Sequence, residues 1–293
     1  MRISSHIFLL GLLMLVGAGC GKTSPSPIDP PTNHEKEIAQ QGTTPNEYSR
    51  LVFGAKSWSK PGPVALVFRI LGKDGGDLKE QDLKIVHEKP VHLLLVRDDM
   101  TQFQHLHPTY QTVEGNGRWV AETIIPEQGI YHVYVDISPE KEEPVVLKTV
   151  LQLVGPARTK AFPSPTSDTS VTTDGIRTAL TAPSPIVTGQ STRLIFSLTE
   201  NGQPVKNIDP YLGAFGHVVI LRHNAPEDFL HVHPVTQTKP TDGKVEFETT
   251  FKTKGRYTLY AQFAANESVQ TFPITIDVGE GAVPSMQDMH QNH

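Results

Sequence analysis

Short stretches of alternating apolar and polar residues run through most of the chain, and clusters of Gly, Pro, Asn and Asp separate them. A period of two indicates β-strands with one face in a core, and we find no helical period of useful length. Asp74-Gly75-Gly76 and Asn201-Gly202 supply the positive φ that tight hairpins require. The pattern predicts strands over 50–53, 64–71, 91–96, 103–107, 119–125, 131–138, 145–153, 176–181, 191–198, 217–221, 229–233, 245–251, 257–264 and 270–278.

These strands form two matching sets of seven. Gly129 and Tyr131 in the first set recur as Gly255 and Tyr257 in the second, before the same predicted strand. Repetition at a fixed offset indicates a tandem duplication. Seven short strands in about 110 residues are typical of an immunoglobulin-like sandwich, and the Gly-x-Tyr step falls where such folds place a tyrosine corner. We therefore predict an all-β chain of two tandem immunoglobulin-like β-sandwich domains.

The N-terminus has the pattern of a lipoprotein signal peptide. Arg2 precedes an apolar run at 7–16, and small residues lead to Cys20. Ten apolar residues are too few to span a bilayer, for which about 20 are needed. We expect lipidation of Cys20; the alternative is an ordinary cleaved signal with an incidental cysteine. The predicted divisions are a signal peptide (1–19), a flexible spacer (20–45), domain 1 (46–156), a linker (157–170), domain 2 (171–279) and a disordered tail (280–293).

Lipidation of Cys20 predicts an extracytoplasmic protein anchored to a membrane of the cell envelope. Gly21, rather than Asp, favours the outer membrane if the host has two. Because Cys20 is the only cysteine, the chain can form no internal disulfide and no copper centre that needs a thiolate. The net charge of −5 and the pI near 6.2 offer no basic surface for nucleic acid.

A histidine motif carries the candidate chemistry. It reads FQHLHP at 103–108 and FLHVHP at 229–234, and a further histidine opens the preceding strand in each repeat. Alternate residues of a strand share a face. An antiparallel hairpin that pairs Leu94 with His105, or Val219 with His231, would bring three imidazoles together at its open end. The candidate metal ligands are His92, His105 and His107 in the first repeat and His217, His231 and His233 in the second.

Three converging imidazoles suit copper or zinc, and we favour copper. The alternative is structural, because duplication also repeats residues that only maintain the fold, and strand histidines can hydrogen-bond to the backbone. His132 has Thr258 as its counterpart, so no role shared by both repeats is expected for it. His87 and His223 fall in predicted loops, where we expect them to be solvated.

We predict no enzymatic activity. The chain contains no Gly-x-Ser-x-Gly motif and no phosphate-binding glycine loop. Two alternatives to metal binding remain open at this point. One is a non-catalytic module of the envelope that binds another protein or a polysaccharide. The other is a metal-dependent enzyme with a water in an open coordination position.

The stretch PYLGAFGHVV at 210–219, followed by FLHVHP, resembles a widespread group of uncharacterised bacterial secreted proteins and lipoproteins. VRDDM at 96–100, followed by FQHLHP, resembles the N-terminal half of that group. The likeness covers both domains, which are similar to YtkA-like domains. It implies immunoglobulin-like sandwiches associated with copper or heavy-metal handling, and a metal role for the six histidines. The first repeat departs from the second by having EKPV at 88–91 where the second has GAFG at 213–216.

Overall fold

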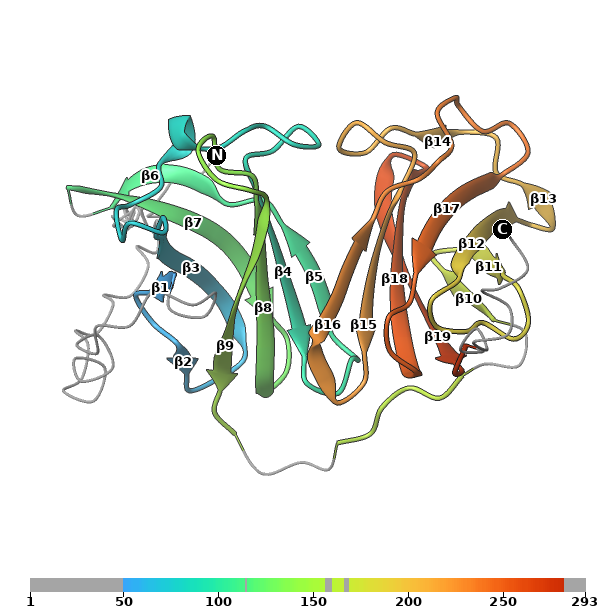
Figure 1. The fold of residues 1–293 in the computed structure, drawn as a ribbon, viewed down its shortest axis with the longest axis horizontal. Coiled ribbons are helices and arrows are strands. Elements are labelled where there is room, and N and C mark those ends of the chain that lie inside the picture. Colours follow the sequence, from blue (N-terminus) through green and yellow to red (C-terminus); the bar gives the residue numbers. More distant parts are fainter. Residues whose placement is uncertain (1–49, 114, 156–159, 166–168, 282–293) are drawn as a thin grey trace, which may run out of the picture.

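The computed structural model describes residues 50–113, 115–155, 160–165 and 169–281. Cys20, the predicted signal peptide and spacer, and nearly all of the predicted tail lie outside these residues. Within them the chain forms two β-sandwich domains side by side (Figure 1). This confirms the predicted fold class.

Domain 1 contains two sheets. All neighbouring strands are antiparallel except β2 and β9, which are parallel. A short 3-10 helix (Glu80–Asp82) lies in the connection before β4. The first sheet has the order β1 (Leu51–Phe53), β3 (Gly62–Ile70), β7 (Asn116–Ile125), β6 (Thr109–Val113), and the second has the order β2 (Ser57–Trp58), β9 (Val145–Leu153), β8 (Gly129–Ile137), β4 (Val91–Arg97), β5 (Phe103–Leu106).

Domain 2 repeats this arrangement. Its first sheet contains β10 (Ser170–Thr173), β11 (Ile176–Thr181), β12 (Ser191–Glu200) and β17 (Lys244–Thr250), with β13 (Gln203–Pro204) also pairing with β12. Its second contains β19 (Ser268–Val278), β18 (Gly255–Ala265), β15 (His217–Arg222) and β16 (Ala225–Val232), with β14 (Ile208–Asp209) pairing with one end of β18. In both domains the second sheet brings together the strands of an immunoglobulin C–F–G sheet with one further edge strand. The strand order therefore defines an immunoglobulin-like topology.

All fourteen predicted strands are present, with shifts of a few residues at their ends. The largest shift is in β16, which begins at Ala225 because the predicted loop reduces to a tight turn in which Asn224 has a φ of 57°. The sequence pattern missed the short strands β2, β13 and β14, together with β6 and β10. These have two to five residues each, too few for an alternating pattern to be recognised.

The Gly-x-Tyr steps form tyrosine corners. The hydroxyl of Tyr131 donates a hydrogen bond to the carbonyl of Glu127 (2.6 Å), and the hydroxyl of Tyr257 donates one to the carbonyl of Thr253 (2.6 Å). Both rings lie at the start of a central strand and are fully buried in the core of their own domain. This pair of bonds confirms the position that the repeat assigned to these tyrosines.

A third apolar cluster joins the two domains. The strands β4 and β15 are buried on both faces: Leu93 and Leu95 enter the core of domain 1, whereas Leu94 and Val96 meet Val219 of domain 2. Two aromatic pairs flank this contact. Phe103 stacks on Tyr260 with ring centroids 4.2 Å apart, and Tyr134 stacks on Phe229 at 4.7 Å. The hairpins β4–β5 and β15–β16 therefore lie face to face at the centre of the molecule (Figure 1).

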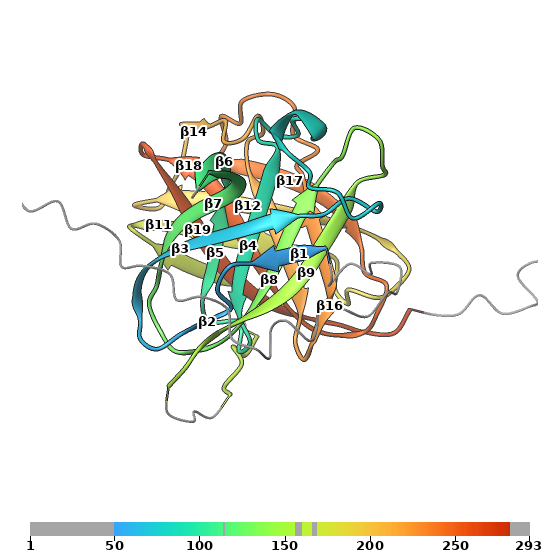
Figure 2. The same ribbon diagram turned by 90° about the vertical axis from the view of Figure 1, so that its left-hand side faces the viewer.

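Seen along the axis from domain 1 to domain 2, the sheets of the two domains overlap (Figure 2). The hairpin turns of β4–β5 and β15–β16 lie at the lower end in Figure 1, near the connection between the domains. The open ends, where β4 and β15 begin, lie at the upper end, and the predicted histidines are located there.

Candidate metal centre

The hairpins β4–β5 and β15–β16 have the strand register that brings the histidines of each domain together. Leu94 pairs with His105 and Val96 with Phe103 in domain 1, and Val219 pairs with His231 in domain 2. This confirms the predicted register. It gathers the six histidines into two triads, and within each triad one ring nitrogen from every histidine lies within 4.8 Å of the others. The triads are His92, His105 and His107, hereafter triad 1, and His217, His231 and His233, hereafter triad 2.

Hydrogen bonds fix which nitrogen faces the neighbouring rings in two members of triad 1, His92 and His105. His92 Nε2 donates to the carbonyl of Val86 at 2.9 Å, which leaves Nδ1 without a proton in the neutral ring. His105 Nδ1 donates to Gln262 Oε1 at 2.8 Å, and the amide of Gln262 is oriented by its own bond to Thr271. His105 Nε2 is then also bare. These two bare nitrogens lie 3.2 Å apart.

Two bare nitrogens that face each other can both bind one metal ion. Two nitrogens bound to one tetrahedral ion at about 2.0 Å lie about 3.3 Å apart, so the observed separation matches that of two ligands of one metal. His107 Nε2, the third donor of triad 1, is buried and has no hydrogen-bond partner among the described residues. Triad 1 therefore has the donor set and spacing of a three-histidine metal site.

Triad 2 is oriented in the same way. His217 Nε2 donates to the carbonyl of Tyr211 at 2.9 Å, and His231 Nδ1 donates to the carboxylate of Asp136 at 3.1 Å. A hydrogen bond from the outer nitrogen to a carboxylate or carbonyl is how metal-binding histidines are usually held. In the described part of the chain the nitrogens left over are buried and unpaired: His217 Nδ1, His231 Nε2 and His233 Nε2.

Burial favours the neutral form of His107, His217 and His233 at neutral pH. Desolvation is the main cause that lowers the pKa of His107 to about 4 and that of His217 and His233 to about 3; the neighbouring imidazoles lower them further. The pKa of His105 lies well below the usual value for the same two reasons. Only a neutral imidazole offers a lone pair to a metal, so these sites are prepared for an ion without first losing protons.

The two triads adjoin each other across the domain interface. The ring of His231 lies 5.7 Å from that of His105 and 5.8 Å from that of His92, measured between centroids. Each triad also takes one orienting partner from the opposite domain: Gln262 for His105, and Asp136 for His231. The two sites therefore form one histidine cluster whose geometry depends on both domains.

Sequence reasoning missed Asp136, Gln262 and the position of His87. Asp136 and Gln262 occupy equivalent positions in the two repeats, but they differ in residue type, so comparing the repeats does not single them out. The expectation that His87 and His223 are solvated was wrong. His87 stacks on His233 with centroids 3.7 Å apart, and His223 is buried, with Nε2 hydrogen-bonded to the hydroxyl of Thr258 at 2.8 Å.

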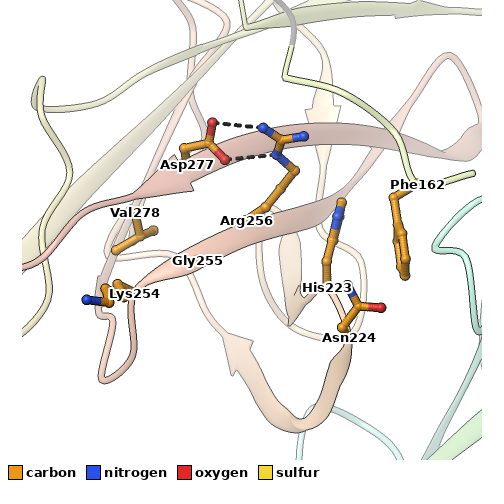
Figure 3. A pocket seen from close by; sticks show the side chains of 8 residues that line it. All are labelled: Phe162, His223, Asn224, Lys254, Gly255, Arg256, Asp277 and Val278. Carbon is orange, nitrogen blue, oxygen red and sulfur yellow. Dashed lines mark hydrogen bonds and ion pairs between the residues drawn. The ribbon is translucent and has the colours of Figure 1, made fainter.

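A separate pocket of about 500 Å³ lies beside His223, at the opposite end of β15 from His217 (Figure 3). Phe162, from the connection between the domains, stacks on His223 with centroids 4.7 Å apart. The two cationic side chains that line the pocket are already paired with carboxylates. Arg256 binds Asp277 through two contacts of 2.9 and 3.2 Å, and Lys254 binds Glu280 at 2.7 Å. The candidate metal donors all lie away from this pocket.

The fold and the histidine cluster define a tandem immunoglobulin-like protein with two potential metal sites. A family model described as "Domain of unknown function (DUF8832)" matches residues 53–152 and 170–280, and the chain belongs to this family. A search of curated proteins by sequence finds no match. The described residues include no helix that is both long enough and apolar enough to span a membrane.

Solved structures give distant likenesses. Trypsin-activated alpha-2-macroglobulin from Escherichia coli is 10% identical with a TM-score of 0.25, over 79% of this chain and 16% of that chain. The fibronectin(III)-like modules of CbhA from Clostridium thermocellum are 8% identical with a TM-score of 0.21, over 78% and 94%. Red sea bream transglutaminase is 12% identical with a TM-score of 0.22, over 84% and 33%. The fold class rests on the strand order described above.

Proposed function

We propose that this protein binds a transition metal at the two histidine triads, with copper preferred to zinc, and serves metal handling or delivery in the cell envelope. The facing nitrogens of His92 and His105 are the main support, because both are bare when each ring donates its single proton outward, to Val86 and to Gln262. An all-imidazole donor set suits copper and zinc, and copper(II) binds such donors more tightly.

The structural alternative is less well supported. Histidines that only maintain a fold satisfy their buried nitrogens with protein partners, because a buried polar atom without one costs about 1–3 kcal/mol. Here four such nitrogens, in His107, His217, His231 and His233, have no partner among the described residues. We propose a binding function and no catalytic one.

The location is proposed from the sequence. Cys20 after an apolar segment and small residues supports a lipid anchor, and the resemblance to YtkA-like domains supports an extracytoplasmic role with copper or another heavy metal. A delivery role would require a partner protein of the envelope that accepts the ion. Incorporation of labelled palmitate that is lost with Cys20→Ser would support the anchor, and equal labelling of the two chains would refute it.

Metal titration tests the binding function. The full chain carrying Cys20→Ser should bind two copper(II) ions, and the variant that also carries His105→Gln and His231→Gln should lose both. His132→Gln is the matched control, because His132 is a partly buried strand histidine outside the triads, and it should leave two ions bound. Unchanged binding by the double-histidine variant would exclude the triads as the sites. Zinc in place of copper shows which ion is preferred.

A further inference from the structure

Equivalent turns precede the two triads. Residues 86–89 and 211–214 each form a two-residue turn closed by a bridge, Val86 to Lys89 and Tyr211 to Ala214. The two central residues have positive φ in both turns: 48° and 65° in the first, 53° and 73° in the second. The turns therefore share one backbone conformation. They differ in the side chain at the first central position, which is His87 in domain 1 and Leu212 in domain 2.

His87 reaches across the interface to triad 2. Its ring stacks on His233 at 3.7 Å and lies 5.6 Å from the ring of His217. A fourth imidazole from domain 1 thus stands beside the three of domain 2.

The turn of domain 2 offers triad 1 no histidine equivalent to His87. The turn that approaches it carries Leu212, an apolar residue with no donor atom, and places the ring of Tyr211 6.3 Å from that of His107. The ring contacts of triad 1 with other histidines are with members of the triads and, at 6.3 Å from His92, with His87. The two sites therefore differ in how closely His87 approaches them: its ring lies 3.7 Å from that of His233 in triad 2 and 6.3 Å from that of His92 in triad 1.

The charges around the triads differ in the same direction. The outer nitrogen of His231 binds the carboxylate of Asp136, whereas that of His105 binds the neutral amide of Gln262. The ammonium of Lys89 acts on His107, and the counterpart of Lys89 in domain 2 is Ala214. Asp136 also acts on His92 of triad 1, but its hydrogen bond goes to His231, so its charge favours a divalent ion more strongly at triad 2, whereas Lys89 disfavours one at triad 1.

We propose that the two sites are graded: triad 2, flanked across the interface by His87 and hydrogen-bonded to Asp136, retains a copper(II) ion, and triad 1 holds a second ion that exchanges readily. This rests on the proposed function, because it assumes that both triads bind metal. Changing one orienting partner of a metal ligand typically alters affinity 10- to 100-fold. We therefore expect triad 2 to bind copper(II) at least about 10-fold more tightly than triad 1.

Single-site chains measure each affinity separately. In the full chain with Cys20→Ser, His107→Gln removes a ligand of triad 1 and His233→Gln removes one of triad 2. Titration of each with copper(II) against a competing chelator gives the two dissociation constants. Each chain loses the equivalent histidine of one triad and keeps the other triad intact. A difference between the two dissociation constants therefore reports on the surroundings of the intact triad.

Exchanging the equivalent residues tests the cause. In the His107→Gln chain, adding His87→Leu and Asp136→Gln gives triad 2 the surroundings of triad 1, and its affinity should fall at least about 10-fold. In the His233→Gln chain, Leu212→His and Gln262→Asp should tighten triad 1. Leucine is already present in the same turn at position 212, so His87→Leu suits the backbone. Nitrogen hyperfine coupling in the copper(II) EPR spectrum of the His107→Gln chain should change when His87→Leu is added alone.

The outcomes separate the two hypotheses. If neither single-site chain binds copper(II), the proposed function fails and the grading fails with it. If both bind with equal affinity, or if the exchange of residues 87 and 136 leaves the affinity of triad 2 unchanged, the grading alone is overturned and the sites remain metal sites. A fall in affinity at triad 2 together with a gain at triad 1 supports it.

Discussion

Proton positions decide how the histidines can act. In each triad the outer nitrogens of two rings donate to fixed acceptors: backbone carbonyls for His92 and His217, and side chains of the opposite domain for His105 and His231. Each bond selects one tautomer and aims the bare nitrogen inward. The same residues without these acceptors would distribute their protons between both nitrogens, and the spacing alone would not make a metal site.

At the residue scale we predict that metal binding persists in mild acid. Imidazoles bind metal only when neutral, and an exposed histidine with a pKa near 6.5 loses about 30-fold in available neutral ring at pH 5. Burial lowers the pKa of His107 to about 4 and that of His217 and His233 to about 3, so their neutral forms persist until the pH falls through those values. Proton competition at these three ligands should therefore weaken copper(II) binding only slightly between pH 7 and pH 5.

The measurement is a chelator competition at pH 7, 6 and 5, corrected for protonation of the chelator. A peptide with the sequence of residues 229–234 is the reference, because it carries the same His-x-His-Pro step without burial. The peptide should lose affinity steeply over this range. An equally steep loss by the folded protein would contradict the neutral, preorganised triads.

At the element scale, the hairpins account for most of what could be predicted. The alternating pattern gave the strands, and a requirement for three histidines on one face gave the register that pairs Leu94 with His105. The sequence pattern did not predict what packs against the outer face of each hairpin. Val91 to Val96 and His217 to Leu221 are apolar at nearly every position, a signal of burial on both sides, but they do not specify what covers them. Contacts such as His105 with Gln262 therefore could not be derived from local sequence.

A one-residue insertion should separate the two histidines of a hairpin. Alanine inserted between His231 and Val232 would move His233 to the opposite face of β16, because side chains alternate along a strand. The chain should then bind one copper(II) ion fewer. The same insertion between Thr241 and Asp242, in the connection from β16 to β17, should leave both sites intact. Two ions bound by both variants would mean that the strand spacing does not create the site.

At the scale of the whole molecule, the interface both joins the domains and completes the sites. Leu221 and Val219 contribute to the apolar cluster between the domains but not to the core of domain 2. Tyr260 adds a hydrogen bond from its hydroxyl to the carbonyl of Met100, at 2.7 Å. The interface can therefore be weakened without removing residues from either sandwich core.

Leu221→Asp should separate the domains and weaken metal binding at both triads. A carboxylate buried in this cluster is strongly unfavourable, and separation removes Gln262 from His105 and Asp136 from His231. We expect a larger radius of gyration by X-ray scattering and a 10- to 100-fold loss of copper(II) affinity at each site. Val269→Asp is the control, because Val269 is 43% exposed on β19 and contributes to none of the apolar clusters. A separated protein with unchanged affinity would show that each triad is complete within its own domain.

The stacked pairs at the interface have one further consequence. Phe103 stacks on Tyr260, and Tyr134 stacks on Phe229. Phe103 and Phe229 are equivalent residues of the two repeats, as are Tyr134 and Tyr260, so the same contact is made twice with the domains exchanged. Two identical subunits related by a two-fold axis make contacts of this self-complementary kind. In such a homodimer every substitution would appear in both halves at once. Joining the halves in one polypeptide removes that restriction, so His87 can face Leu212 and Asp136 can correspond to Gln262.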